Sequence, residues 1–210
     1  MSITGPSWQP SLLAIGPPSF DPGFQGVARE ELADGAWIER LPRWLLGDGA
    51  LLDALWASTR WRVQERPMYD RVVAVPRLTA GLPADGPGHP LVDAMGRALS
   101  LRYGVPFDRV GLACYRDGRD SVAWHGDYVG RTQDEALVAT VSLGERRRFL
   151  LRPAGGGRSR AFQLGWGDLF VMGGSCQRTW EHAVPKVARA GARLSIMFRS
   201  SAHFGAWRPS

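Results

Sequence analysis

Apolar residues in two segments of the first half of the chain follow the spacing of a helix. In residues 47–58 and 90–103 they recur every three or four positions, which predicts two amphipathic helices. Runs of β-branched and aromatic residues predict strands at 36–41, 61–63 and 72–75. Residues 1 to about 30 are rich in Pro, Gly and Ser without a sustained period, so we expect them to run extended over the surface.

From residue 110 onward the pattern changes to short strands separated by glycine-rich turns. The glycines at 155–157 mark an open hairpin tip. The predicted strands are 110–115, 121–125, 137–143, 147–151, 161–164, 168–172 and 193–199. Strands of this length and spacing are typical of a β-sandwich or barrel such as a jelly roll. We therefore expect a mainly β (α+β) fold that the two helices flank.

Two polar turns in this half have an ordinary structural interpretation. The charged run 145–148 (ERRR) is more typical of a solvated hairpin turn than of a nucleic-acid contact. Asp168 lies in a tight turn after Gly167, where we expect its carboxylate to accept hydrogen bonds from local amides. Neither turn is expected to take part in chemistry.

Composition narrows the class of protein. A chain of 210 residues can form one full-sized domain with a substantial core. No apolar run approaches the ~18 residues that cross a bilayer, and the first residues lack the basic and apolar regions of a secretory signal. The two cysteines have neither a disulfide framework nor zinc-site spacing. We expect a cytoplasmic protein without a membrane contact, and nothing in the sequence indicates a protein partner.

The net charge of +6 is carried almost wholly by arginine, because Lys186 is the only lysine. Arginine presents a planar group that suits phosphate oxygens and stacks on rings, and a basic surface favours a nucleic-acid partner. A GC-rich codon bias would give the same arginine-rich composition without any partner. The charge therefore permits nucleic-acid binding but does not establish it.

The candidate chemistry lies in the segment 124–127 (WHGD). His125 and Asp127 are two residues apart, so in a strand both side chains point to one face. His182, in a later strand-like segment, would complete a set of two imidazoles and one carboxylate, the ligand set of non-haem Fe(II) oxygenases. A lone His-x-Asp is common by chance. The chain has only four histidines, however, and two of them, His125 and His182, sit inside strand-like segments of this half, which favours an iron site.

Arg193 and Arg199 lie on one face of the last predicted strand, since they are six residues apart. The opposite face is apolar, with Leu194, Ile196 and Phe198. Surface charges on an edge strand are the alternative interpretation. An arginine pair opposite an apolar face is better explained as an inward pair, able to bind a dicarboxylate co-substrate.

Several separated motifs, in this order, resemble the AlkB family: 115–118 (YRDG), 124–127 (WHGD), 167–169 (GDL) and 180–182 (WEH). Residues 193–199 are similar to the C-terminal strand of that family, which carries two co-substrate arginines, and 76–80 (PRLTA) to the segment that opens its base-recognition lid. The resemblance spans roughly residues 60–200. AlkB-family proteins are Fe(II)- and 2-oxoglutarate-dependent dioxygenases that remove alkyl groups from nucleic-acid bases.

The resemblance implies a double-stranded β-helix (jelly-roll) catalytic core at 106–203. An extended segment at 1–30 and an N-terminal extension with the substrate lid at 31–105 would precede it, and a tail at 204–210 would follow. The implied cofactors are Fe(II), 2-oxoglutarate and O₂. The implied iron ligands are His125, Asp127 and His182, and the implied 2-oxoglutarate residues are Tyr115, Arg193, Ser195 (where relatives often have Asn) and Arg199. Arg193 would pair with the distal carboxylate.

The implied function is oxidative dealkylation of N-alkylated bases in DNA or RNA, with release of formaldehyde, succinate and CO₂. The candidate substrate residues are Tyr69, Arg77, Trp124 and Tyr128. A flipped base needs stacking and edge contacts to compensate for its extrusion, and each of the three rings has core or lid packing as its alternative role.

Three departures from the family pattern keep the substrate open. Ala113 stands where relatives often have Asn, Val129 where many have an acidic residue, and the segment 81–88 has no aromatic residue. The same oxygenase chemistry on a protein side chain or a small molecule is therefore the second hypothesis. A non-catalytic nucleic-acid-binding module is the third, and the intact ligand set counts against it.

Overall fold

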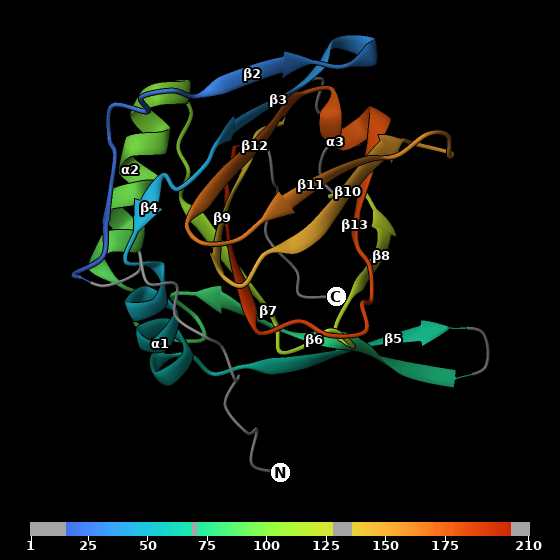
Figure 1. The fold of residues 1–210 in the computed structure, drawn as a ribbon, viewed down its shortest axis with the longest axis horizontal. Coiled ribbons are helices and arrows are strands. Elements are labelled where there is room, and N and C mark those ends of the chain that lie inside the picture. The colour runs from blue at the N-terminus through green and yellow to red at the C-terminus, as the bar shows by residue number, and fades with distance from the viewer. Residues whose placement is uncertain (1–15, 69–70, 128–135, 203–210) are drawn as a thin grey trace.

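The computed structural model describes residues 16–68, 71–127 and 136–202. Two antiparallel sheets form its core (Figure 1). The eight-stranded major sheet has the spatial order β2 (Ala28–Glu31), β3 (Ala36–Leu41), β12 (Asp168–Gly174), β9 (Val138–Gly144), β14 (Arg193–Arg199), β7 (Arg109–Tyr115), β6 (Arg71–Leu82) and β5 (Arg62–Met68). The four-stranded minor sheet has the order β11 (Arg160–Leu164), β10 (Arg147–Pro153), β13 (Trp180–Val184) and β8 (Val122–His125). The expected mainly β, jelly-roll fold class is confirmed.

Two helices cover the outer face of the major sheet, as predicted from their apolar spacing. Figure 1 shows α1 (Asp48–Ser58) and α2 (Pro90–Tyr103) together on the side of the major sheet away from the minor sheet. The ends of α2 explain its bounds: the His89 ring accepts a hydrogen bond from Leu91 N, Pro90 opens the first turn, and Gly104 closes the last turn with φ of 69°. Among the helices of the described residues, none is long and apolar enough to cross a membrane.

Alternation in β14 separates two hydrophobic clusters. Leu194, Ile196 and Phe198 pack with the helices, and the same cluster includes side chains of both α1 and α2. The opposite face of the major sheet packs against the minor sheet, through residues such as Tyr115, Phe149 and Phe170. Because a strand alternates its faces, Arg193 and Ser195 lie on this interior face, where they are buried. Buried polar residues between two sheets indicate a functional site there.

Some strands differ from their predicted bounds. β5 and β6 are longer than 61–63 and 72–75 and form one long hairpin along an edge of the major sheet. The strand-like segment around His182, for which no bounds were predicted, forms β13 at residues 180–184. Of the predicted extended segment 1–30, the structure describes residues 16–30, which contain turns as well as strands. There β2 pairs with β3, and a short β1 (Ser19–Phe20) pairs with β4 (Leu45–Leu46). The short elements η1 (Ala33–Gly35) and α3 (Cys176–Thr179) complete the fold.

Candidate metal centre

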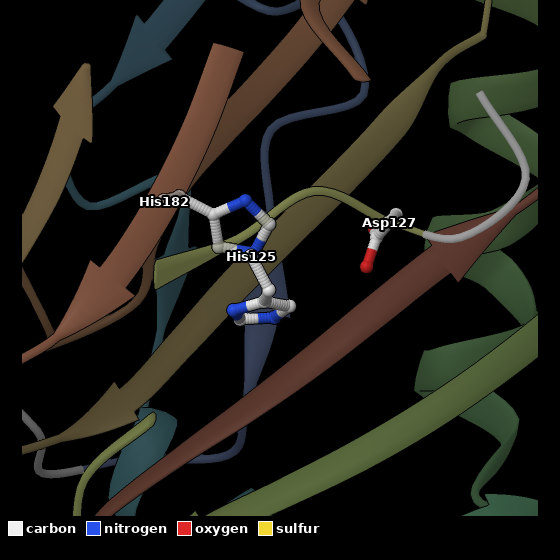
Figure 2. Close-up of side chains that lie close together, drawn as sticks. All are labelled: His125, Asp127 and His182. Carbon is white, nitrogen blue, oxygen red and sulfur yellow. The ribbon is translucent and has the colours of Figure 1, made fainter. Parts of the chain in front are cut away.

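The minor sheet brings together the three residues predicted to bind metal. His125 ends β8 and pairs directly with His182 on β13, and Asp127 follows two residues after His125. One ligand atom from each residue lies within 4.8 Å of the other two (Figure 2). The two imidazole rings are 4.3 Å apart between centroids. Two imidazoles and a carboxylate at this separation can hold one metal ion.

The protonation states of this group suit metal binding. Burial, with the nearby His125, lowers the pKa of His182 to about 3, so its imidazole is neutral at pH 7. Burial opposes ionisation of Asp127, but Arg199 and the two histidines outweigh it and lower the pKa of this carboxyl to about 2. A neutral imidazole and an ionised carboxylate are the forms that bind metal. The donor set therefore fits a divalent cation.

A backbone carbonyl orients His125. Its Nδ1 lies 2.8 Å from the carbonyl oxygen of Ala123. A carbonyl only accepts, so Nδ1 carries the proton in this contact and Nε2 is the nitrogen that can bind metal. His182 is held differently, because its ring stacks on Phe149 with 5.3 Å between centroids. Both rings are thus fixed by contacts outside the ligand group.

Arg199 contacts the candidate metal centre itself. Its Nε and Nη2 donate to Asp127 Oδ2 over 3.2 and 2.9 Å. Its side chain passes over Gly111, where an added Cβ would lie 3.3 Å from Nη1. Because Gly111 has no side chain, Arg199 can cross the strand and reach Asp127. The structure thus places this predicted co-substrate residue beside the carboxylate ligand.

Arg193 is a buried cation without a carboxylate partner among the described residues. It is 1% exposed, and its Nη2 donates to Ser142 Oγ over 2.7 Å. Its Nε is buried and makes no hydrogen bond. The ring of Tyr115 lies 5.5 Å from Cζ, and burial lowers the pKa of Arg193 to about 10. A buried, uncompensated guanidinium favours an anionic ligand, so this pocket fits a carboxylate of 2-oxoglutarate.

Ser195 and Arg77 complete the set of predicted residues near this pocket. Ser195 is buried opposite Ser142 in the strand register. Arg77 Nη1 donates to the Tyr115 hydroxyl over 3.3 Å, and the charge of Arg77 contributes to the lowered pKa of His182. Arg77 therefore contacts the predicted co-substrate residue Tyr115 and acts electrostatically on the candidate metal centre.

The structure does not bring Trp124 to the metal centre. Its ring lies 4.0 Å from Cζ of Arg152, which donates two hydrogen bonds to Glu181. Arg152 alternates with the interior residue Leu151, so this stack lies on the outer face of the minor sheet, away from His182. The other predicted substrate residues, Tyr69 and Tyr128, and the departure at Val129 lie outside the described residues.

Arg147 corrects the interpretation of the charged run 145–148. It is 2% exposed rather than solvated. Its guanidinium donates to the backbone carbonyls of Asp117, Asp120 and Pro185 over 2.8, 2.9 and 2.9 Å. It therefore ties the segment before β8 to the segment after β13, the two strands that carry the histidines. The sequence contains a signal for this burial, because Arg147 shares a strand face with Phe149 and Leu151.

Asp168, as expected, accepts hydrogen bonds from the amides of Arg43 and Gly165.

Arg147→Met is expected to lower the free energy of unfolding by about 2 kcal/mol, because three backbone carbonyls lose a charged donor. Arg148→Met is the matched control, since Arg148 is exposed on the same strand and should change stability by less than about 0.5 kcal/mol. Urea denaturation measures both. Equal stabilities of the two variants would show that the Arg147 hydrogen bonds do not hold this region together.

Comparison with known proteins gives the chain a family. A model of the 2OG-Fe(II) oxygenase superfamily matches residues 64–199. DNA oxidative demethylase ALKBH2 of Arabidopsis thaliana is 31% identical over 134 residues, covering 52% of this chain and 43% of the relative. Alpha-ketoglutarate-dependent dioxygenase alkB homolog 3 of Homo sapiens is 25% identical over 172 residues, covering 71% of this chain and 60% of the relative. The chain thus spans only about half the length of these curated relatives.

A solved structure supports the fold. The structure of OsALKBH1 matches with a TM-score of 0.58 at 15% identity, covering 82% of this chain and 100% of that chain. At this identity the match concerns the fold alone. The family model covers most of the chain, and the His125, Asp127 and His182 group lies within the matched residues. The chain is therefore an AlkB-like member of the 2OG-Fe(II) oxygenase superfamily, a family whose cofactors are Fe(II), 2-oxoglutarate and O₂.

Proposed function

We propose that this protein is a dioxygenase that oxidatively dealkylates N-alkylated bases in DNA or RNA. The products would be the restored base, formaldehyde, succinate and CO₂. The observation that carries the proposal is the cluster of His125, Asp127 and His182 beside the buried cation of Arg193. The names of the relatives, a DNA oxidative demethylase and an alkB homolog, support the nucleic-acid substrate.

In this proposal His125, Asp127 and His182 hold Fe(II). Fe(II) bound there, with 2-oxoglutarate and O₂, supplies the oxidising power to hydroxylate an N-alkyl carbon. Burial keeps His182 neutral, and the contacts of both rings fix their orientation, so these ligands need not reorganise to bind the metal. Arg199 holds the Asp127 carboxylate in its ionised form through two hydrogen bonds.

The co-substrate pocket would bind 2-oxoglutarate mainly through charge. Arg193 would pair with the distal carboxylate, and its burial makes this attraction stronger than it would be in water. The hydroxyls of Tyr115 and Ser195, both buried on the same interior face, would orient the bound dicarboxylate. Because the pocket lies between two sheets, it would also exclude water from the reacting groups.

The same oxygenase chemistry on a protein side chain or a small molecule is the second candidate. One observation favours it: Trp124 stacks with Arg152 on the outer face of the minor sheet and so provides no surface for a flipped base. The net charge of +6 favours the nucleic acid. The substrate assay decides between these two.

The assay follows succinate and formaldehyde after O₂ is added to the protein, Fe(II) and 2-oxoglutarate mixed anaerobically. We expect a methylated single-stranded oligonucleotide to raise succinate formation at least about tenfold, with one formaldehyde for each added succinate. The unmethylated oligonucleotide of the same sequence is the control and should give no formaldehyde. Succinate that no methylated DNA or RNA increases would support the second candidate, and no succinate under any condition would contradict both.

A further inference from the structure

A buried glutamine lies directly beside the candidate metal centre. Gln177 belongs to α3 and is 4% exposed. Its side-chain Oε1 accepts a hydrogen bond from the backbone N of Asp127 over 3.3 Å. Its Nε2 is buried and has no hydrogen-bond partner among the residues that the structure describes. No feature of the sequence singled out this residue, since its contact with Asp127 joins positions fifty residues apart.

The turn that carries Gln177 is held firmly in place. Ser175 Oγ donates to the carbonyl of Asp34 over 2.6 Å, and Thr179 Oγ1 donates to the carbonyl of Ser175 over 3.1 Å. The turn runs directly into β13, which carries His182. Gln177 therefore connects two candidate ligands. It is hydrogen-bonded to the segment of Asp127, and its own turn continues into the strand of His182.

Gly126 allows this contact. It lies between His125 and Asp127, and a Cβ built there would be 2.9 Å from the carbonyl oxygen of Gln177. The backbones of the turn and of the ligand segment thus approach closely where position 126 has no side chain. This close approach brings the Gln177 amide within reach of Asp127.

We propose that Gln177 is a positioning residue for the metal centre: by accepting from the Asp127 backbone N, it fixes the segment that aims the Asp127 carboxylate at the metal. The inference rests on the proposed metal role of His125, Asp127 and His182. Groups that orient a ligand in this way commonly change metal affinity 10- to 100-fold when they are removed.

The side-chain amide of Gln177 could serve either to position Asp127 or to stabilise the packing of the fold, and its Nε2 favours the first role. Most buried side-chain amides have hydrogen-bond partners for both of their polar groups. Here half of the amide is unsatisfied, which disfavours the folded state. Methionine is similar in length but has neither this donor nor the acceptor for Asp127 N, so Gln177→Met relieves one unsatisfied group and leaves another. Its free energy of unfolding should therefore stay within about 1 kcal/mol of that of the natural chain. A positioning role and a packing role therefore predict opposite results for this variant.

The experiment titrates the protein with Co(II), followed by its visible absorption without 2-oxoglutarate or O₂, so that the readout is independent of turnover. We expect Gln177→Met to raise the Kd for Co(II) about 10- to 100-fold, with a Tm close to that of the natural chain. Gln163→Met is the matched control, because Gln163 is exposed on β11, and it should bind Co(II) as the natural chain does.

A second variant guards against an unexpected packing effect. Gln177→Glu retains an acceptor of the same length, so we expect its Kd to stay within about threefold of the natural value. The inference is overturned if Gln177→Met binds Co(II) as tightly as the natural chain, or if Gln177→Glu loses as much affinity as Gln177→Met. A natural chain that binds no Co(II) would instead contradict the proposed metal role and, with it, the inference.

Discussion

Asp127→Ala is expected to lower kcat/KM for 2-oxoglutarate turnover at least about 1000-fold, which corresponds to about 4 kcal/mol. The change removes the carboxylate from the group of three candidate ligands and leaves only two imidazoles. It also removes the carboxylate that accepts two hydrogen bonds from Arg199, so less negative charge offsets this guanidinium beside the same centre. A positive charge at that place repels a metal cation. Both effects act in the same direction.

Succinate formation measures this loss, and near-UV circular dichroism with a thermal melt shows whether the variant folds. Asp93→Ala is the matched control, because Asp93 is an exposed aspartate on α2, and it should keep full turnover. Asp127→Ala should retain a cooperative melt, since the two hydrophobic clusters do not include Asp127. Activity of a folded Asp127→Ala variant within tenfold of the natural chain would remove Asp127 from the metal site.

Alternation along the strands was the part of the fold that the sequence predicted best. In β14 every second residue is apolar and packs toward the helices, so the inward direction of Arg193 follows from the pattern alone. The closeness of His125 and Asp127 follows from their spacing in the chain, although β8 ends at His125 and Asp127 lies two residues beyond it. These features depend on neighbours in the chain, and such features can be recognised without a structure.

The rest depends on contacts between distant segments. β13 consists of Trp-Glu-His-Ala-Val, which has no clear alternation, and it is a strand because it pairs with β10 and β8. The hairpin of β5 and β6 continues through two prolines, which usually end strands. Pro67 lies on β5, the outermost strand of its sheet. An edge strand tolerates proline because every second N–H of such a strand points away from the sheet and has no strand partner.

In the candidate site, too, contacts between distant segments could not be predicted from the sequence. The positions of His125, Asp127, His182 and Arg193 could be predicted because each residue type has a chemical role of its own. Arg147 donates to backbone carbonyls of other segments, and Gln177 accepts from the backbone N of Asp127, fifty residues away. Neither contact leaves a periodic pattern in the sequence.

Arg193→Met is expected to raise the KM for 2-oxoglutarate about 100-fold, or about 2.7 kcal/mol, without lowering the free energy of unfolding. The proposed ion pair with the distal carboxylate would be lost, and truncating one partner of a buried charged pair commonly costs 2 kcal/mol or more. Succinate formation against 2-oxoglutarate concentration measures the first effect. Arg148→Met, at an exposed position, is the control and should leave this KM unchanged.

Arg193→Met should leave the stability of the fold unchanged, which separates a ligand-binding role of Arg193 from a structural one. Burial lowers the pKa of Arg193, which means that folding disfavours its charged form. Without a ligand, this charge is offset by one hydrogen bond to Ser142, so a methionine of similar volume should fold as well or better. Arg147 has three carbonyl partners, and its replacement should destabilise the fold instead. A KM unchanged by Arg193→Met would remove Arg193 from the co-substrate site, whereas a large loss of stability would show that this buried cation serves the fold.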